Sequence, residues 1–427
     1  MSGLEPTSLK QVINRPPGRE RWLMLALAWS LYASFGVIVA SIPPLVIPIL
    51  EDLEISNGQM GLVLGAWQFV YIFTAFPLGV VIDRIGIRKA LGIGIIIALA
   101  SMVLRGFATN FWTLLLAVAL FGFGGPIISI GAPKVVSVWF RGAERNLAAG
   151  IYATGPVAGS AIALATAVNL VVPLTGSWRG ISVVYGAVVF AIACGWWLLS
   201  RDEPGAKPKR PRPWGFGFLP IRCHSHEGSD LPPLLSIRNV QVLVVIAIGS
   251  FLVNHGLTSW LPTLLEEGGM TGGQAGAWAA VAMAMGAVGT MSMARFAVPG
   301  RRVVFMGILF TAVSVTTMGL ALGGGATLIT ALLFTNAVRM PLMPLASLIL
   351  MDTVEVGAGR VGAVIGLYFT AAEIGGFGGP FLLGMLRDAT GSLTQGIVIL
   401  ALVAAAFVLV LPLIKENPPE GLSLRRK

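Results

Sequence analysis

The stretch GLYFTAAEIGG, from Gly366 to Gly376, lies within a long apolar run and has a partial copy earlier in the chain. The copy, GIYATGPVAGS, runs from Gly150 to Ser160, at an offset of 366 − 150 = 216 residues. The two stretches align without a gap and share Gly, Tyr, Thr and Gly at the same spacing. Only the later copy has a carboxylate, Glu373, in place of Val157. A chain of 427 residues that repeats at half its length is expected to consist of two similar halves.

The composition is that of a membrane protein. Hydrophobic residues make up 56% of the chain and charged residues 11%, whereas soluble domains have roughly 45–50% and 25%. Twelve apolar runs reach about 20 residues, the length that crosses ~30 Å of hydrocarbon as a helix. The eighth and ninth runs are the least distinct, because only RFAVPGRR separates them. The sequence therefore predicts an all-α membrane protein whose twelve transmembrane helices form two six-helix pseudo-repeats.

The distribution of positive charge predicts the orientation. If both termini are cytoplasmic, most of the 29 Lys and Arg residues fall in cytoplasmic segments, as the positive-inside rule requires. The net charge of +10 is then a topology signal and an attraction to anionic lipid headgroups, so no nucleic-acid partner is needed to explain it. The polar N-terminal segment lacks a small-residue cleavage site, so we expect no removable signal peptide.

A polar, Pro-rich segment near the middle of the chain is expected to link the two halves. Cys223, His224 and His226 lie within it, but no second ligand cluster follows at the usual spacing, so we expect no metal site. With Cys194 in a helix, a disulfide is not expected either. The predicted units are a cytoplasmic N-terminal segment (1–21), a six-helix bundle (22–199), a cytoplasmic linker (200–238), a second six-helix bundle (239–414) and a cytoplasmic tail (415–427).

A second repeat supports the duplication. LEDLEISNGQMG (Leu50–Gly61) follows the first apolar run, and LEEGGMTGGQAG (Leu265–Gly276) follows the seventh, at an offset of 265 − 50 = 215 residues. In each copy an acidic helix end precedes Ser56 or Thr271, which suits the N-cap of the next helix. Duplicated bundles of this kind hold their binding site near the bilayer midplane, between the two halves.

The loop after the second apolar run resembles a known signature. It reads GVVIDRIGIRK, which is similar to the G-x-x-x-D-R-x-G-x-R-K loop of the major facilitator superfamily. The resemblance extends over roughly residues 21–416 and implies that fold, with the loop acting as a cytoplasmic latch. We expect Asp83 to meet the positive end of the eleventh helix, near Gly357 to Arg360, and Gly79 to allow close helix approach. The expected latch residues are Gly79, Asp83, Arg84, Gly86, Arg88 and Lys89.

Other stretches narrow the resemblance. NHGLTSWLPTLLEEGGMTGGQAG, PKVVSVWF and AAEIGGFGGP are most similar to the cyanate/nitroimidazole porter branch. The fourth apolar run lacks the buried Arg of proton-driven drug antiporters in this superfamily. GPVAG, from Gly155 to Gly159, is nevertheless similar to part of the antiporter signature. It is either an efflux feature or, as a Pro kink with small residues, a helix-packing feature.

Three ionisable residues lie deep in apolar runs of the second half: Arg339, Glu373 and His255. A charge at mid-bilayer costs roughly 2.5–3.5 kcal/mol on insertion scales, so such residues are functional candidates by default. Arg339 and Glu373 either form a structural ion pair or divide two roles. In the second case the planar fork of Arg339 holds an anion and Glu373 is the proton-coupling group. Lys134 is either a vestibule charge or a snorkelling side chain.

Aromatic and amide side chains are expected to complete the site around these charges. Asn254 precedes His255, and Asn336 lies one helical turn before Arg339. Trp67 and Tyr71 are further candidates on the second helix. The full set of expected substrate-binding residues is Arg339, His255, Asn254, Tyr152, Tyr368, Asn336 and Gln68.

These features predict a secondary transporter that moves a small organic or inorganic anion by alternating access, with Glu373 as the candidate group for proton coupling. The alternative is an efflux carrier for a neutral or weakly basic small molecule, and a third reading is a receptor without transport. No phosphate-binding loop or nucleophile elbow occurs, so we expect neither an enzyme nor a cofactor. We expect a monomer in the bacterial cytoplasmic (inner) membrane, with the lipid bilayer and a small-molecule substrate as its partners.

Overall fold

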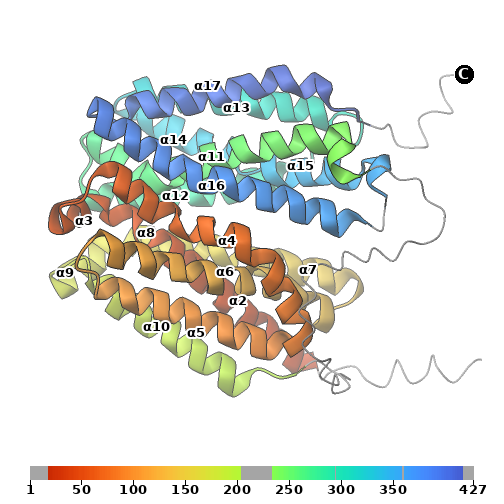
Figure 1. The fold of residues 1–427 in the computed structure, drawn as a ribbon, viewed down its shortest axis with the longest axis horizontal. Helices are drawn as coiled ribbons and strands as arrows, with labels where there is room; N and C mark the ends of the chain where they lie inside the picture. The colour runs from red at the N-terminus through yellow and green to blue at the C-terminus, as the bar shows by residue number, and fades with distance from the viewer. Residues whose placement is uncertain (1–17, 203–232, 294, 358–359, 417–427) are drawn as a thin grey trace, which may run out of the picture.

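The computed structural model describes residues 18–202, 233–293, 295–357 and 360–416, and all regular structure in these residues is helical (Figure 1). Twelve helical segments of the described chain are long and apolar enough to cross a membrane. They include the eighth and ninth, Gly272–Met293 and Arg302–Leu322. The prediction of an all-α membrane fold with twelve transmembrane helices is confirmed. Cys223, His224 and His226 lie outside the described residues.

The two halves of the chain lie side by side in Figure 1, the first in red to yellow-green and the second in green to blue. In the first half, the first and fifth spans each consist of several consecutive helical pieces. Its elements are α2 (Gly18–Ala40), η1 (Pro43–Leu45), α3 (Val46–Leu53), α4 (Asn57–Ile85), α5 (Ile87–Gly106), α6 (Phe111–Trp139), α7 (Gly142–Ala153), α8 (Gly155–Thr166), η2 (Ala167–Val171), α9 (Val172–Thr175) and α10 (Gly180–Leu199).

The second half repeats the six spans. Its tenth span is divided into α14 and α15, which meet just after Arg339. The elements are η3 (Leu234–Ser236), α11 (Arg238–Glu267), α12 (Gly272–Met293), α13 (Arg302–Leu322), α14 (Ala326–Arg339), α15 (Leu342–Met351), η4 (Val354–Val356), α16 (Val361–Thr390), α17 (Thr394–Val410) and η6 (Leu411–Leu413).

The helix starts predicted from the second repeat are present. The Ser56 hydroxyl accepts from the Gln59 backbone N–H at 3.2 Å, and the Gln59 side chain accepts from the Ser56 N–H at 3.0 Å. Thr271 and Gln274 form the same reciprocal pair at 3.3 and 3.1 Å. Each pair satisfies backbone donors that a helix N-terminus leaves free. The two halves therefore begin their second helix in the same way.

Glycines let equivalent helices pack backbone to backbone in the two halves. A Cβ on Gly159 of α8 would lie 1.9 Å from the Ala33 carbonyl oxygen of α2. A Cβ on Gly375 of α16 would lie 1.7 Å from the Ile248 carbonyl oxygen of α11. Just before α8 the helix is interrupted at Thr154, and Pro156 occupies its first turn. These contacts support the helix-packing interpretation of GPVAG.

The two halves meet closely at one of the two ends of the bundle. We call these ends the α3 end and the α7 end, after the short helices at the left and right of Figure 1. At the α3 end, a Cβ on Gly61 of α4 would lie 2.5 Å from the Pro380 carbonyl oxygen of α16. At the same end the Asn169 side chain donates to the Gly273 carbonyl at 2.9 Å. The halves are therefore closed together at the α3 end.

Candidate substrate site between the two halves

A cavity of about 140 Å³ lies between the two halves. The first half contributes residues from α2, η1, α4 and α8, and the second half contributes residues mainly from α11, with one from α12. Three of the predicted substrate-binding residues line it: Gln68, Asn254 and His255. The complete lining is Val39, Ala40, Pro43, Leu64, Trp67, Gln68, Ser160, Leu164, Asn254, His255, Thr258, Ser259, Met283 and Met340.

Arg339 lies directly behind this lining and is only 5% exposed. Its Nη1 donates to the Asn254 carbonyl at 2.7 Å, and its Nη2 donates to the Thr258 hydroxyl at 2.9 Å. Nη2 also donates to the Asn336 side-chain oxygen at 2.7 Å, whereas Nε–H has no partner. The guanidinium is therefore held by neutral groups beside the cavity wall.

Arg339 and Glu373 do not form an ion pair among the described residues, whose salt bridges all involve other groups. The structural ion pair considered from the sequence is therefore wrong. The reason is geometric: Arg339 directs its Nη atoms to α11 and to its own helix, and Glu373 projects from α16. A buried charge without an opposite partner is costly unless it is hydrogen-bonded.

Glu373 lies deep in α16, 7% exposed, and its Oε2 has no hydrogen-bond partner. A Cβ built on Gly376 would lie 2.9 Å from this oxygen, 3.3 Å from the His255 ring and 3.4 Å from the Gln68 side chain. Three polar groups from three helices therefore converge on one glycine. The missing side chain at Gly376 provides the space that they occupy.

Gln68 and His255 connect the two halves at the cavity. The Gln68 amide N–H donates to His255 Nδ1 at 3.1 Å, which requires the ring tautomer whose proton is on Nε2. The His255 ring also packs against Trp67 of α4 and Phe251 of α11, with centroid distances of 6.1 and 5.3 Å. Gln68 is buried, and its Oε1 has no partner. The cavity therefore has an unused hydrogen-bond acceptor beside the contact between the halves.

The other predicted residues occupy supporting positions. Asn336 is buried against Arg339 and donates to the Leu332 carbonyl at 2.9 Å. Tyr368 is buried and packs edge-on against Phe369, and Tyr152 stacks on Tyr32 at a centroid distance of 6.0 Å. Neither tyrosine lines the cavity, and neither do Asn336, Arg339 or Glu373.

The sequence reasoning missed neutral members of the site. Thr258, Ser259 and Ser160 line the cavity, as do Met283 and Met340. Helical spacing gave one signal for Thr258, which lies one turn after Asn254 on α11, but small hydroxyl residues are common in transmembrane helices. Among the described residues, no group of three or more His, Cys, Asp or Glu is placed to hold a metal ion.

Arg105 is a buried charge whose depth the sequence reasoning also missed. It is 1% exposed, and its Nη1 donates to the Ile38 carbonyl at 2.8 Å and the Ser41 hydroxyl at 3.1 Å. These partners lie at the end of α2, where helical carbonyls lack intrahelical donors. Arg105 therefore caps the C-terminal end of α2, and it does not line the cavity.

The predicted latch residues lie at the α7 end. The Lys134 ammonium lies 2.6 Å from the Asp83 carboxylate, which places Lys134 in an ion pair within the first half. Gly86 has φ = 87° where α4 ends, a conformation that favours glycine. A Cβ on Gly79 would meet no heavy atom within 4 Å, so the close helix approach expected there is absent. Arg84 and Lys89 are exposed.

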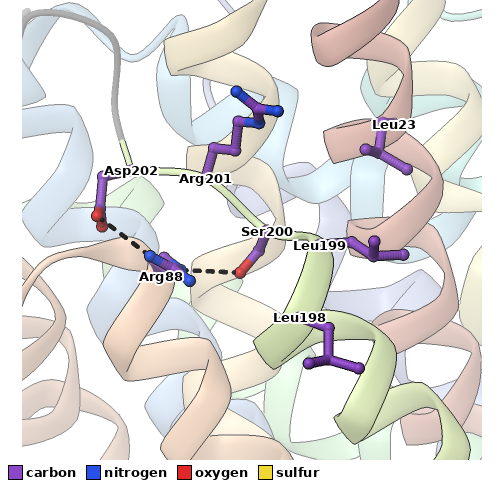
Figure 2. Close-up of a pocket in the computed structure, with 7 residues that line it drawn as sticks. All are labelled: Leu23, Arg88, Leu198, Leu199, Ser200, Arg201 and Asp202. Atoms are coloured by element: carbon purple, nitrogen blue, oxygen red, sulfur yellow. Dashed lines mark hydrogen bonds and ion pairs between the residues drawn. The ribbon is translucent and has the colours of Figure 1, made fainter.

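A larger hollow of about 440 Å³ lies at the same end, next to Arg88. Figure 2 shows Arg88 between Ser200 and Asp202, to which it donates at 3.1 and 3.3 Å. These contacts join the start of α5 to the residues that follow α10. The hollow is open and remote from the deep ionisable residues, so we assign the substrate site to the smaller cavity between the halves. The other lining residues are Leu23, Leu198, Leu199 and Arg201.

Known proteins share both sequence and fold with this chain. Human "Monocarboxylate transporter 11" is 28% identical over 399 residues, which cover 89% of this chain and 79% of that protein. The "Hexuronate transporter" of Bacillus subtilis (strain 168) is 25% identical over 367 residues, covering 81% and 82%. "Probable L-galactonate transporter" of Escherichia coli (strain K12) is 26% identical over 155 residues, covering only 36% and 34%. These names do not support the expected cyanate/nitroimidazole branch, which corrects that part of the resemblance.

The solved structure of a bacterial homologue of the human lysosomal transporter Spinster, inward-facing and unoccupied, has the same fold. It superposes with a TM-score of 0.72 at 18% identity, covering 95% of this chain and all of that one. A family model described as Major Facilitator Superfamily matches residues 24–380, most of the chain. With twelve spans and a cavity between two repeated halves, the chain belongs to the major facilitator superfamily.

Proposed function

We propose that this protein is a secondary transporter that moves a small organic anion through the cavity between its halves by alternating access. The observation that carries the proposal is Arg339, a buried cation beside the cavity without a carboxylate partner among the described residues. The named relatives, transporters of monocarboxylates and sugar acids, support an organic anion as the substrate.

Arg339 would hold the carboxylate of the substrate. Its unpartnered Nε–H and its Nη2 form one edge of the guanidinium, which matches the two oxygens of a carboxylate. Nη2 now donates to the Thr258 hydroxyl, which lines the cavity. Because Nη2 also donates to Asn336, an incoming carboxylate would have to displace one of these two acceptors to receive two parallel hydrogen bonds.

Glu373 would couple transport to protons. Since it does not pair with Arg339, it would act through charge: a carboxylate beside the site opposes the entry of an anion, and its protonation removes that opposition. The position supports this role, because Glu373 approaches the same segment of α11, at His255, that carries the Arg339 partner Asn254. The expected activity is proton–anion symport, with uptake that increases as the outside is acidified.

The efflux alternative loses its main support. GPVAG suggested it, but Gly155 and Gly159 approach the backbone of α2 closely, which explains these glycines by packing. An efflux carrier for a neutral or weakly basic molecule would also not need a buried Arg beside its cavity. The test below also distinguishes a transporter from a receptor without transport.

We also propose that the protein is a monomer in the bacterial inner membrane and that its α7 end faces the cytoplasm. Arg84, Arg88 and Lys89 lie at this end, as the positive-inside rule requires. Asp83, which pairs with Lys134, would contact the start of α16 in the conformation that is closed at the α7 end. Asp83→Asn should then slow exchange between the two conformations and leave substrate binding nearly unchanged. Normal transport by this variant at normal expression would remove the latch from the mechanism.

A thermal-shift screen of the purified protein, followed by uptake into proteoliposomes, tests the function. Small carboxylates should raise Tm and should accumulate when the outside is acidified. If only neutral or weakly basic amphiphiles raise Tm and are transported, the efflux alternative is correct. If carboxylates bind but no condition gives uptake or exchange, the protein is a receptor.

A further inference from the structure

The size of the cavity limits the substrate. Its volume is about 140 Å³, close to the roughly 150 Å³ cavity that holds one benzene molecule in a protein interior. Small-molecule sites for drug-sized ligands are larger, roughly 300–1,000 Å³. The site is therefore suited to an anion whose body contains only a few carbon atoms.

The walls of the cavity are mostly apolar on the side of the first half. Leu64 and Trp67 come from α4, and Leu164 comes from α8. Met283 and Met340 line the opposite side, and methionine adapts to irregular apolar surfaces. A hydrocarbon body would lose contact with water and gain contact with these side chains, at roughly 25 cal/mol per Å² of buried apolar area.

Several polar groups in the lining already have partners, although Gln68 Oε1 has none. The Thr258 hydroxyl donates to the Asn254 carbonyl at 2.7 Å, and Ser160 donates to the Gly36 carbonyl at 3.1 Å. The Gln68 amide nitrogen is used by His255. A polyhydroxylated acid would bring several hydroxyls to these groups. Each buried hydroxyl left without a partner costs about 1–3 kcal/mol.

We infer that the substrate is a short monocarboxylate with an apolar body rather than a polyhydroxylated sugar acid. This inference rests on the proposed function, because Arg339 must hold the carboxylate. The apolar wall then receives the hydrocarbon end.

Binding of three probes to the purified full-length protein tests this substrate class. Butyrate should bind at least tenfold more tightly than gluconate, and neutral butyramide should bind more weakly than butyrate. Equal or tighter binding of gluconate, if lost in Arg339→Ala, would overturn the apolar-body inference and leave the anion carrier intact. No Arg339-dependent binding of either acid would refute the proposed function itself.

A cavity-wall variant separates shape from charge. Leu164→Asn adds an amide to the apolar wall without touching Arg339 or its partners. It should weaken butyrate binding several-fold and narrow the difference between butyrate and gluconate. An unchanged preference, in a variant whose Tm matches that of the wild type, would contradict the role of this wall.

A second, independent observation concerns the α3 end. Asp388, in the last turn of α16, accepts from the backbone N–H groups of Asn57 and Gly58 at 2.9 and 2.7 Å. It also accepts from the Asn57 side chain at 2.8 Å. These are the first residues of α4, where a helix has free donors and partial positive charge. A carboxylate from the second half therefore caps a helix of the first half.

Neighbouring contacts reinforce this cap. Arg387 donates to the Asn57 side-chain oxygen at 2.7 Å and pairs with Glu267 at 2.8 Å. The relation is the reverse of the proposed latch, in which Asp83 near the end of α4 meets the start of α16. We infer that Asp388 holds the α3 end closed, and we call it the clamp. The α4–α16 pair would then have one carboxylate for each closed state: Asp388 for closure at the α3 end and Asp83 for closure at the α7 end.

Cysteine accessibility tests the clamp without a substrate. In a background with Cys194→Ser and Cys223→Ser, Leu164→Cys provides a buried reporter near the α3 end. Asp388→Asn should raise its labelling rate by an impermeant maleimide at least threefold. Asp52→Asn is the matched control, because Asp52 lies at the same end but pairs with Arg179 of its own half. A wild-type labelling rate in Asp388→Asn, or an equal increase of the labelling rate in Asp52→Asn, would contradict the role of Asp388 as the clamp.

Discussion

Helices α8 and α16 contain the two copies of one repeated stretch, and they share their packing but differ in their chemistry. Gly159 and Gly375 lie against the carbonyl oxygens of Ala33 and Ile248 in the same way. At the equivalent positions Val157 and Glu373, by contrast, only the second copy has an ionisable group. The difference teaches that the two halves share a packing contact, and that only the second half places a charge beside it.

The same division applies to the whole cavity. The first half contributes neutral side chains, among them Trp67, Gln68 and Ser160. The second half contributes His255 to the lining and places Arg339 and Glu373 directly behind it. The first half therefore supplies neutral walls, and the second half supplies the ionisable groups to which we assign binding and coupling.

The largest expected effect comes from filling the shared packing contacts. Gly375→Ala and Gly159→Ala should both prevent correct packing, because each new methyl group would overlap a backbone carbonyl that cannot rotate away. Overpacking costs about 1–3 kcal/mol or more. We expect both variants to lose most monodisperse protein in size-exclusion chromatography.

Gly366→Ala and Gly150→Ala are the controls for these variants, since a Cβ at either position meets no heavy atom within 4 Å. Both should purify like the wild type. If only one of the two packing variants is damaged, the halves do not share this contact in the membrane, and the comparison between the copies fails.

The second prediction concerns the charge that only one copy has. Glu373→Gln resembles the protonated state, so it should keep substrate binding and counterflow exchange. It should lose accumulation driven by a proton gradient, which for one proton per anion is about tenfold per pH unit. The measurement is uptake into proteoliposomes, with Glu51→Gln, an exposed carboxylate change on α3, as the control.

Retained accumulation with normal pH dependence in Glu373→Gln would show that Glu373 does not couple transport to protons. His255 would then be the next residue to test, since its unperturbed titration range lies nearest neutrality.

A smaller effect is expected from the glycine beside Glu373. Gly376→Ala would place a methyl group 2.9 Å from the end of the Glu373 side chain, which can move aside. Transport should fall by about two- to tenfold, or about 0.4–1.4 kcal/mol, while the protein remains folded. Gly378→Ala, with no heavy atom within 4 Å of its Cβ, is the control. A wild-type transport rate in Gly376→Ala would mean that transport does not depend on the exact position of the Glu373 side chain.

The sequence predicted the fold well because the fold depends on signals that repeat. Apolar length gave the twelve spans, and the Ser56 and Thr271 caps marked the same helix start in both halves. The site was predicted only in part. The cost of burying a charge in the bilayer identified Arg339 and Glu373 as candidate site residues. This cost could not predict whether the two side chains touch, because contact depends on the direction in which each side chain leaves its helix.

The neutral residues of the site gave weaker sequence signals than the charged residues did. Thr258 and Met283 are ordinary residues of transmembrane helices, and only their position across the cavity gives them a role. Tyr152 and Tyr368 are equivalent in the repeat, but in this structure they pack against Tyr32 and Phe369 and do not line the cavity.

The most direct test of the account is the affinity of the transported anion for Arg339 variants, measured by calorimetry on purified protein. Arg339→Lys keeps the charge but loses the planar fork, so the anion should bind more weakly, and Arg339→Ala should abolish binding. Asn336→Asp would confirm that Arg339 acts through its charge, since a carboxylate at its Nη2 partner should also weaken binding. Wild-type affinity in both Arg339→Lys and Arg339→Ala, with unchanged Tm, would contradict the assignment of Arg339 as the anion contact.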